Sequence, residues 1–254
     1  MGSKCEANRD IKDNNFNYKR NIIPLLKNAD KTKENIILLT TGSFNPIHRM
    51  HLEILNIAYK HLLSLKKYNI LCAFISPSSD CYVRNKQPPL IPFSLRCQMI
   101  QASIDEFYKE NKDKEQNIVK IFIHKWEGSH NYFIDFPDVI KVIQEQLDKI
   151  GNVKLLYVCG MDHFIKCHYS LKQNVVVVER KPFNINLNNE IYKSIPNKMV
   201  FLIRDVNSKE YSSSSIRDFY KKRDYESIKK ATFENVDQMI IKFYDKNKEK
   251  FTQE

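Results

Sequence analysis

The chain has 254 residues, of which 42% are hydrophobic, and this is enough to bury a core in one large α/β domain or two small ones. Lysine and arginine outnumber aspartate and glutamate by 41 to 30, and the formal charge of +11 favours anionic partners such as nucleotides, nucleic acid or acidic membranes. The six cysteines show no C-x-x-C spacing, no signal peptide precedes them, and no apolar run reaches the roughly 20 residues of a membrane span. These features argue against a disulfide framework, a four-cysteine zinc site and a membrane protein, and they indicate a soluble intracellular protein of the cytoplasm, the nucleus or both.

Residues 1–34 are polar, rich in asparagine and lysine, and without sustained periodicity. We therefore expect a mostly disordered leader, followed by a single domain over residues 35–254. The first residues, MGSKCE, offer Gly2 and Cys5 for lipidation, but Glu6 stands where the myristoylation pattern requires serine or threonine. No role for the leader follows from its sequence.

Short apolar runs alternate with helical patterns along the rest of the chain. Strands are predicted at Ile36–Thr41, Ile70–Ile75, Ile118–His124, Lys154–Cys159, Val175–Glu179 and Met199–Ile203. Alternation of this kind predicts an α/β fold, with a Rossmann-like open parallel sheet and helices on both faces. No internal repeat or long linker indicates a second domain.

Helices are predicted where apolar residues recur at helical spacing and where proline, aspartate or serine precedes them. They lie at about 50–63, 93–104, 135–150, 214–222 and 235–248. The first of these helices has His51 in its first turn. The last two form a small C-terminal helical part.

The stretch LLTTGSFNPIHRMHLEIL, residues 38–55, joins a strand to a helix through a glycine and an Asn-Pro pair. Ligands of an open parallel sheet bind beyond the carboxyl ends of its strands, where Gly42 stands. A glycine there lets backbone N–H groups approach an anion, and the N-terminus of the following helix attracts negative charge. His48 and His51 lie one helical turn apart and face the same guest. The stretch predicts a phosphate clamp rather than histidines that only cap a helix.

A second cluster, EYSSSSIRDFYKKRD, covers residues 210–224. Serine is a preferred helix N-cap, and the four serines lead straight into a helix with Arg217 in its first turns. Hydroxyls, free N–H groups and a guanidinium at one helix end can hold an anion. Alone, the cluster fits a solvated helix cap equally well; with the first motif it predicts two sites that grip one polyphosphate.

These two segments, with ISPSSDCYVRNKQPPLIP, KWEG, YVCGMD and VVVVER in order, resemble the eukaryotic nicotinamide or nicotinate mononucleotide adenylyltransferases. That family belongs to the nucleotidyltransferases with an H/T-x-x-H and an I-S-S-T-x-I-R motif, and the resemblance covers about residues 36–251. It implies transfer of the adenylyl group of ATP to nicotinamide or nicotinate mononucleotide, giving NAD or its deamido form and pyrophosphate. It also implies Mg²⁺ or another divalent cation, held by the ATP phosphates and not by protein side chains.

The resemblance implies a role for each matching residue. His51, His48 and Arg217 are the implied catalytic residues, which stabilise the ATP phosphates during transfer. The implied binding residues are Gly42, Ser43 and Phe44 for the mononucleotide and phosphate, Gly160 and Asp162 for the adenosine ribose and base, Ser212, Ser213 and Ser214 for the triphosphate, and Arg84 and Arg180 for the nucleotide substrates.

Several positions depart from the family pattern. Tyr211 and Ser214 replace the usual isoleucine and threonine of the serine motif, and Ser214 keeps a hydroxyl. Trp126 matches a family Trp-Glu, and Tyr132 or Phe133 follows where a ring that stacks on the pyridine is expected. The animal enzymes carry a second tryptophan, for which Tyr169 is the candidate substitute here. The pyridine partners and the preference between amide and acid substrates stay open.

The implied chemistry suits these residues, because the attacking phosphate oxygen is already an anion and needs no general base. Positioning and charge neutralisation remain, and histidines, an arginine, helix N-termini and Mg²⁺ supply them. We expect ATP, the two mononucleotides and NAD as partners, with neither specific nucleic acid nor membrane, and we leave a homo-oligomer open.

Two alternatives remain. A cytidylyltransferase or a pantetheine-phosphate adenylyltransferase usually has glycine before the second histidine, where Met50 stands here, and lacks Trp126-Glu127. A basic RNA-binding module would use the charge and the segment FYKKRDYESIKK, although such a charge run is usually a solvated helix face.

Overall fold

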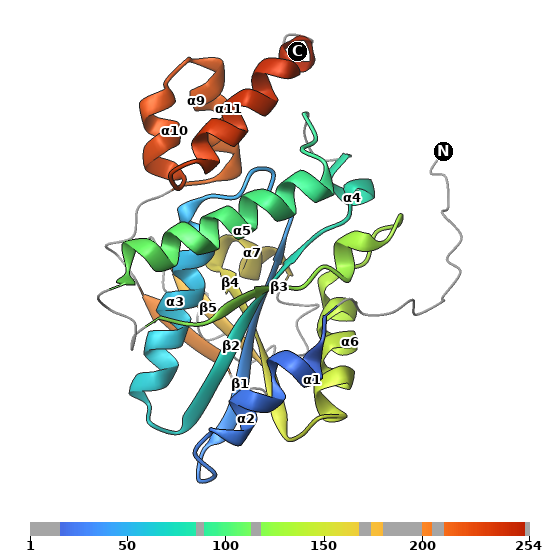
Figure 1. Cartoon of the computed structure of the whole chain (residues 1–254), viewed down its shortest axis with the longest axis vertical. Coiled ribbons are helices and arrows are strands. Elements are labelled where there is room, and N and C mark those ends of the chain that lie inside the picture. Colours follow the sequence, from blue (N-terminus) through green and yellow to red (C-terminus); the bar gives the residue numbers. More distant parts are fainter. Residues whose placement is uncertain are drawn as a thin grey trace.

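Six parallel strands form the centre of the molecule (Figure 1). The computed structural model describes residues 16–84, 89–112, 118–167, 174–179, 200–204 and 211–251. The strands are β1 (Glu34–Gly42), β2 (Tyr68–Pro77), β3 (Ile121–Ile123), β4 (Val153–Gly160), β5 (Val175–Glu179) and β6 (Val200–Arg204). Their order across the sheet is β3-β2-β1-β4-β5-β6. The predicted parallel sheet is confirmed, although β3 is shorter than the predicted run 118–124.

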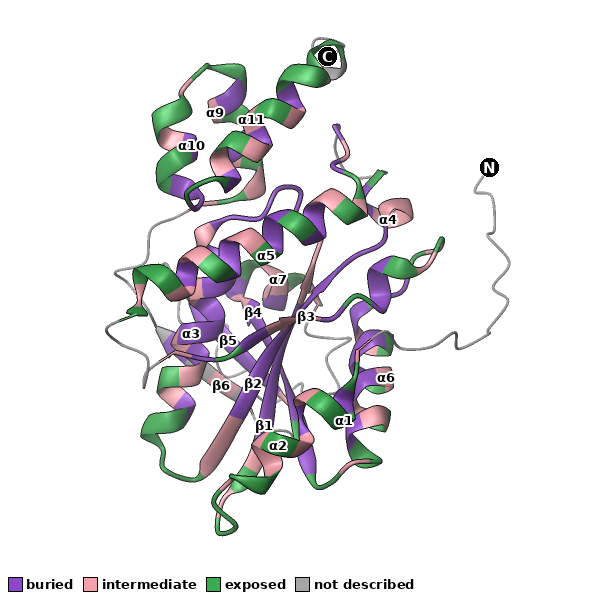
Figure 2. Cartoon of the chain, in the orientation of Figure 1, coloured by how far each residue is buried: buried purple, intermediate pink, exposed green. Residues whose placement is uncertain are grey.

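The central strands are buried on both faces, as Figure 2 shows. In β1 the side chains of Ile36 and Leu38 join one apolar cluster, whereas those of Ile37 and Leu39 join the other. Successive side chains of a strand point to opposite faces, so a parallel strand between two helical layers needs an unbroken apolar run. This requirement explains why the strands could be recognised in the sequence.

The helices cover both faces of the sheet (Figure 1). One cluster packs α3 (Arg49–Ser64) and α5 (Phe93–Glu110) against the sheet, and the other packs α6 (Phe136–Asp148) and α7 (Met161–Cys167). Asp135 caps α6 by accepting a hydrogen bond from the backbone N–H of Phe136, as predicted. The short helices α4 (Asp80–Arg84), α7 and α10 (Tyr225–Ala231) were not predicted, because five to seven residues carry too little periodicity.

Residues 16–34 differ from the expected disordered leader. They form α1 (Tyr18–Asn21), α2 (Ile23–Lys27) and the start of β1, and Ile22 is fully buried. The hydroxyl of Tyr18 lies 2.8 Å from Nε2 of His124, whose pKa burial lowers to about 3. The Phe16 ring packs edge-on against Phe74, with 4.9 Å between the ring centroids. A few apolar side chains of this polar segment pack against one face of the sheet and hold the segment there. Composition alone does not predict such contacts.

The C-terminal helices α9 (Ser213–Lys221), α10 and α11 (Val236–Lys246) lie beyond the carboxyl end of the sheet (Figure 1) and share its apolar cluster. The guanidinium of Arg49 links them to the rest of the domain. It donates two hydrogen bonds, of 2.6 and 2.7 Å, to the carboxylate of Glu110 and lies 4.3 Å above the ring of Phe233. In the described residues no helix has both the length and the apolar character that crossing a bilayer requires.

Candidate active site

The strand order reverses between β1 and β4, and in open α/β sheets ligands bind at such a switch point. β1 ends at Gly42 and β4 ends at Gly160, so the two glycine-containing motifs leave the sheet side by side. Two cavities lie there, and the N-terminus of α9 contributes side chains to both.

The first cavity has a volume of about 230 Å³. It brings together five of the predicted site residues, namely His48, His51, Gly160, Asp162 and Ser212. The second cavity, of about 460 Å³, brings together four more, namely Ser43, Ser213, Ser214 and Arg217. Ser212 and Ser213 are consecutive and line different cavities, so both cavities reach the start of α9. The two sequence motifs therefore form one site.

The two histidine rings lie against each other at the start of α3, with an angle of 31° between their planes. Their ring centroids are 3.6 Å apart, and the backbone N–H of His48 donates to Nδ1 of His51 over 3.1 Å. Because Nδ1 of His51 accepts this bond, the neutral ring carries its proton on Nε2. His51 can therefore donate from Nε2 to an anion in the first cavity.

The side chain of Phe44 packs against His51. Its buried ring packs edge-on against the His51 ring at 4.7 Å, and its backbone has a φ of +46°. A side chain at Gly42 would crowd this ring, because a Cβ there would lie 3.3 Å from Cζ of Phe44. Gly42 and Phe44 therefore shape the site, and Phe44 lines neither cavity.

The serine motif is fastened to the turn that follows β1. Ser212 caps α9 by accepting a hydrogen bond from the N–H of Ser215 over 3.0 Å, and the Ser213 hydroxyl donates to the carbonyl of Pro46 over 2.7 Å. The buried Arg217 donates to the carbonyl of Asn45 over 2.6 Å and to the Ser214 hydroxyl over 2.9 Å. These bonds hold the N-terminal end of α9 against the histidine motif.

Arg96 is a positioning residue that the sequence analysis missed. Its guanidinium is fully buried and donates to the carbonyls of Ile91, Ser43 and Ser78 and to the Asp80 carboxylate, at 2.7–2.9 Å. It thereby joins the segments after β1 and β2 to the start of α5. Burial lowers the pKa of Arg96, and the hydrogen bond to Asp80 opposes that shift. An arginine beside apolar residues at 97, 99 and 100 was the signal that could have revealed it.

A hydrogen-bonded tyrosine in the first cavity was also missed. The hydroxyl of Tyr157 lies 3.0 Å from Oγ1 of Thr41 and 3.1 Å from Nε2 of His163. Burial raises the pKa of Tyr157, so its hydroxyl stays protonated. The tyrosine thereby connects β1, β4 and α7 at the switch point.

The other predicted residues lie outside these cavities or beyond the described residues. Arg84 ends α4 and is exposed, and Trp126 is buried in the core with its ring against His130. Phe133 is 49% exposed and stacks on Tyr82 at 4.5 Å. Arg180 and Tyr169 lie outside the described residues.

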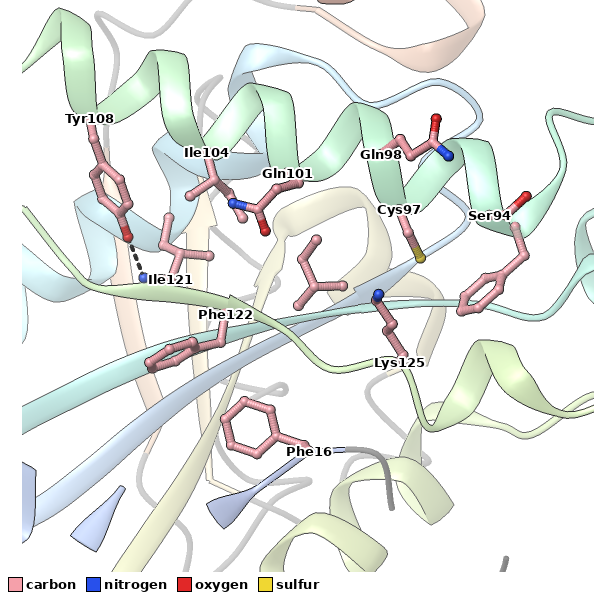
Figure 3. Close-up of a pocket in the computed structure, with 12 residues that line it drawn as sticks. Phe16, Ser94, Cys97, Gln98, Gln101, Ile104, Tyr108, Ile121, Phe122 and Lys125 are labelled. Carbon is pink, nitrogen blue, oxygen red and sulfur yellow. Dashed lines mark hydrogen bonds between the residues drawn. The ribbon is translucent and has the colours of Figure 1, made fainter. Parts of the chain in front are cut away.

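A wider cavity, of about 900 Å³, lies apart from the predicted site (Figure 3). It runs along the edge strand β3, with Gln101 on α5 above and Phe122 on β3 below. None of the predicted site residues lines it. In the described part of the chain, no three or more His, Cys, Asp or Glu side chains are grouped so that they could hold a metal ion.

Glu127 is a buried carboxyl group beside the end of β2. The Ser76 hydroxyl donates to it over 2.7 Å, and burial raises its pKa to about 7. The next residue must be glycine, because a Cβ at Gly128 would lie 2.5 Å from the carbonyl oxygen of Pro77.

We expect the raised pKa of Glu127 to make the free energy of unfolding fall as pH rises. Between the unfolded pKa of 4.5 and the folded pKa of about 7, the folded state binds more protons than the unfolded state. Stability should therefore decrease by up to roughly 1.4 kcal/mol per pH unit in that window. Urea unfolding from pH 4.5 to 8 of the wild type and of Glu127→Gln tests this, and equal slopes for both proteins would contradict it.

The strand order and the cavities at the switch point are those of a Rossmann-like nucleotide-binding protein. The sequence model of the cytidylyltransferase-like family matches residues 39–219, which include both histidines and Arg217. The chain therefore belongs to the cytidylyltransferase-like family.

Individual relatives with curated names match about half of the chain. The chain is 28% identical over 123 residues to the nicotinamide/nicotinic acid mononucleotide adenylyltransferase 1 of Bos taurus. This match covers 48% of this chain and 38% of that protein. It is 30% identical over 132 residues to the probable nicotinate-nucleotide adenylyltransferase of Helicobacter hepaticus, with 51% and 56% covered. The matched segments thus span only about half, or less, of each relative's length.

Solved structures match over more of the chain. The nicotinic acid mononucleotide adenylyltransferase of Plasmodium falciparum complexed with APC is 25% identical, with a TM-score of 0.62, and the match covers 83% of this chain and 97% of that one. The same enzyme complexed with NaAD gives 24% identity and a TM-score of 0.60. The predicted fold class is confirmed by this likeness.

Proposed function

We propose that the protein transfers the adenylyl group of ATP to nicotinamide or nicotinate mononucleotide, forming NAD or its deamido form and pyrophosphate. The observation that carries the proposal is that the histidine cavity and the serine-arginine cavity each combine residues of the two sequence motifs, at the switch point of the sheet. The names of the relatives and the extent of the match to the Plasmodium falciparum enzyme support the choice of substrates.

The reaction is an in-line displacement at the α-phosphorus. An oxygen of the mononucleotide phosphate forms the new bond to that phosphorus, the bond to the bridging oxygen breaks, and the electron pair leaves with pyrophosphate. The attacking oxygen is already ionised, so no residue has to remove a proton. The protein has to align the two phosphates and neutralise the charge that develops.

Each part of the site has a role in that task. The Nε2 proton of His51 is proposed to bond the α-phosphate, and the His48 ring lies against the His51 ring in the same cavity. Arg217, Ser213 and Ser214 face the outer phosphates from the second cavity. Each well-placed donor contributes roughly 2–4 kcal/mol of transition-state stabilisation.

The remaining contacts belong to the substrates' other groups. ATP enters as its Mg²⁺ complex, with the cation carried by the phosphates. Gly160 and Asp162 at the end of β4 are proposed to hold the adenosine ribose. Phe133, exposed against Tyr82, is the ring proposed to receive the pyridine, and Arg84 and Arg180 remain predicted nucleotide contacts.

Pyrophosphate release from MgATP tests the proposal. We expect release with nicotinamide mononucleotide, nicotinate mononucleotide or both, and none without an acceptor. CTP as the donor, and phosphopantetheine as the acceptor, test the other chemistries known in this superfamily. Release only with CTP or only with phosphopantetheine would contradict the proposal.

A further inference from the structure

Lys166 lies in the last turn of α7 and lines the second cavity together with Arg217, Ser213 and Ser214. We propose that Lys166 is a further phosphate-binding residue, which holds the outer phosphates of ATP and the pyrophosphate that leaves. This inference rests on the proposed function. It adds to the site the positively charged side chain of Lys166, which lies outside both sequence motifs.

Arg217 by itself cannot neutralise the negative charge of a polyphosphate bound in this cavity. The Arg217 residue is 8% exposed, and its guanidinium already donates hydrogen bonds to the Asn45 carbonyl and the Ser214 hydroxyl. Part of its hydrogen-bonding capacity therefore fastens α9 to the histidine motif. A polyphosphate needs more donors than such a committed arginine supplies.

Lys166 is available to supply them. Its side chain is exposed, and within the described residues its ammonium has neither an ion-pair nor a hydrogen-bond partner. An ammonium on a flexible stem offers three donors that can follow a phosphate as it departs. The described side chains that line this cavity include two cations and no carboxylate, so none of them repels an anion.

The helix that carries Lys166 is fixed against the sheet. Met161 and Phe164 of α7 are buried, and Nε2 of His163 lies 3.1 Å from the Tyr157 hydroxyl. Asp162 lines the first cavity and Lys166, four residues later, lines the second. Four residues advance a helix by about 6 Å, so α7 presents one group to each half of the site. This placement orients ATP with its ribose near Asp162 and its outer phosphates near Lys166.

Equilibrium binding separates this role from a structural one. We would measure the dissociation constants of MgATP, pyrophosphate and AMP by calorimetry, without any acceptor, for the wild type and for Lys166→Met, Lys166→Arg and Lys125→Met. Loss of a charge-assisted bond should weaken MgATP and pyrophosphate about tenfold in Lys166→Met and leave AMP within about twofold. Lys166→Arg should keep most of the affinity, and Lys125→Met, in the separate cavity of Figure 3, should match the wild type.

The results distinguish this inference from the proposed function. Wild-type affinity for MgATP in Lys166→Met, or an equal loss for AMP, would overturn the role of Lys166. Selective loss for MgATP and pyrophosphate would support it, even if neither mononucleotide supports turnover in the wild type. In that case the substrate assignment would fail and the phosphate assignment would stand.

Discussion

Replacing His51 with alanine is expected to lower kcat for adenylyl transfer by roughly 100- to 1,000-fold, the cost of losing one preorganised donor to the transition state. The backbone N–H of His48 donates to Nδ1 of His51, which leaves Nε2 of this cavity-lining ring as the donor proposed for the α-phosphate. The ground-state affinity for MgATP should change much less, because this bond strengthens as the α-phosphate gains charge. Steady-state kinetics with calorimetric binding of MgATP measures both quantities.

His61→Ala is the matched control for this experiment. His61 lies in the last turn of the same helix, near the ring of Phe201, and lines neither cavity. It should retain wild-type kcat. If His51→Ala keeps a folded structure and more than about a tenth of the wild-type kcat, His51 does not have the role assigned to it.

Replacing Arg96 with methionine is expected to lower the free energy of unfolding by about 3–5 kcal/mol, the range for removing one member of a buried charged network. Methionine fills much of the volume but leaves three backbone carbonyls and the Asp80 carboxylate without their donor. Arg96→Lys should also be costly, because an ammonium cannot reproduce the planar fork of the guanidinium. Urea denaturation followed by circular dichroism measures the change.

The exposed Arg20 in α1 provides the control, and Arg20→Met should stay within about 0.5 kcal/mol of the wild type. Arg96 holds the loops after β1 and β2, which are proposed to bind the substrates, so KM should rise in any fraction of Arg96→Met that folds. A stability loss below about 1 kcal/mol would show that the loops after β1 and β2 do not depend on this guanidinium.

The parts of the fold that the sequence predicted are those with a local signal. β1 could be predicted because burial between two helical layers demands an unbroken apolar run, as in Ile36, Ile37, Leu38 and Leu39. His51 could be placed in a first turn because the apolar spacing begins directly after it. The serine cap of α9 follows from the intrinsic preference of serine for that position.

The missed parts depend on contacts between distant residues. The hydrogen bond from Arg217 to the Asn45 carbonyl joins residues 172 positions apart in the sequence, and no periodic pattern predicts it. Arg96 interacts mainly with backbone carbonyls. Every residue has such a group, so the sequence does not indicate which ones Arg96 contacts. Order in residues 16–33 depends on a few side chains, such as Phe16 and Tyr18, that meet partners more than fifty positions away.

The measurement that tests the central claim most directly follows the α-phosphorus of ATP. The protein would be incubated with Mg²⁺, either mononucleotide and ATP labelled at the α- or the γ-phosphorus. We expect the α-label to appear in the dinucleotide and the γ-label in pyrophosphate, and we expect both conversions to be roughly 100- to 1,000-fold slower in His51→Ala. Retention of the α-label in ATP, or its release in AMP without a dinucleotide, would contradict adenylyl transfer by this site.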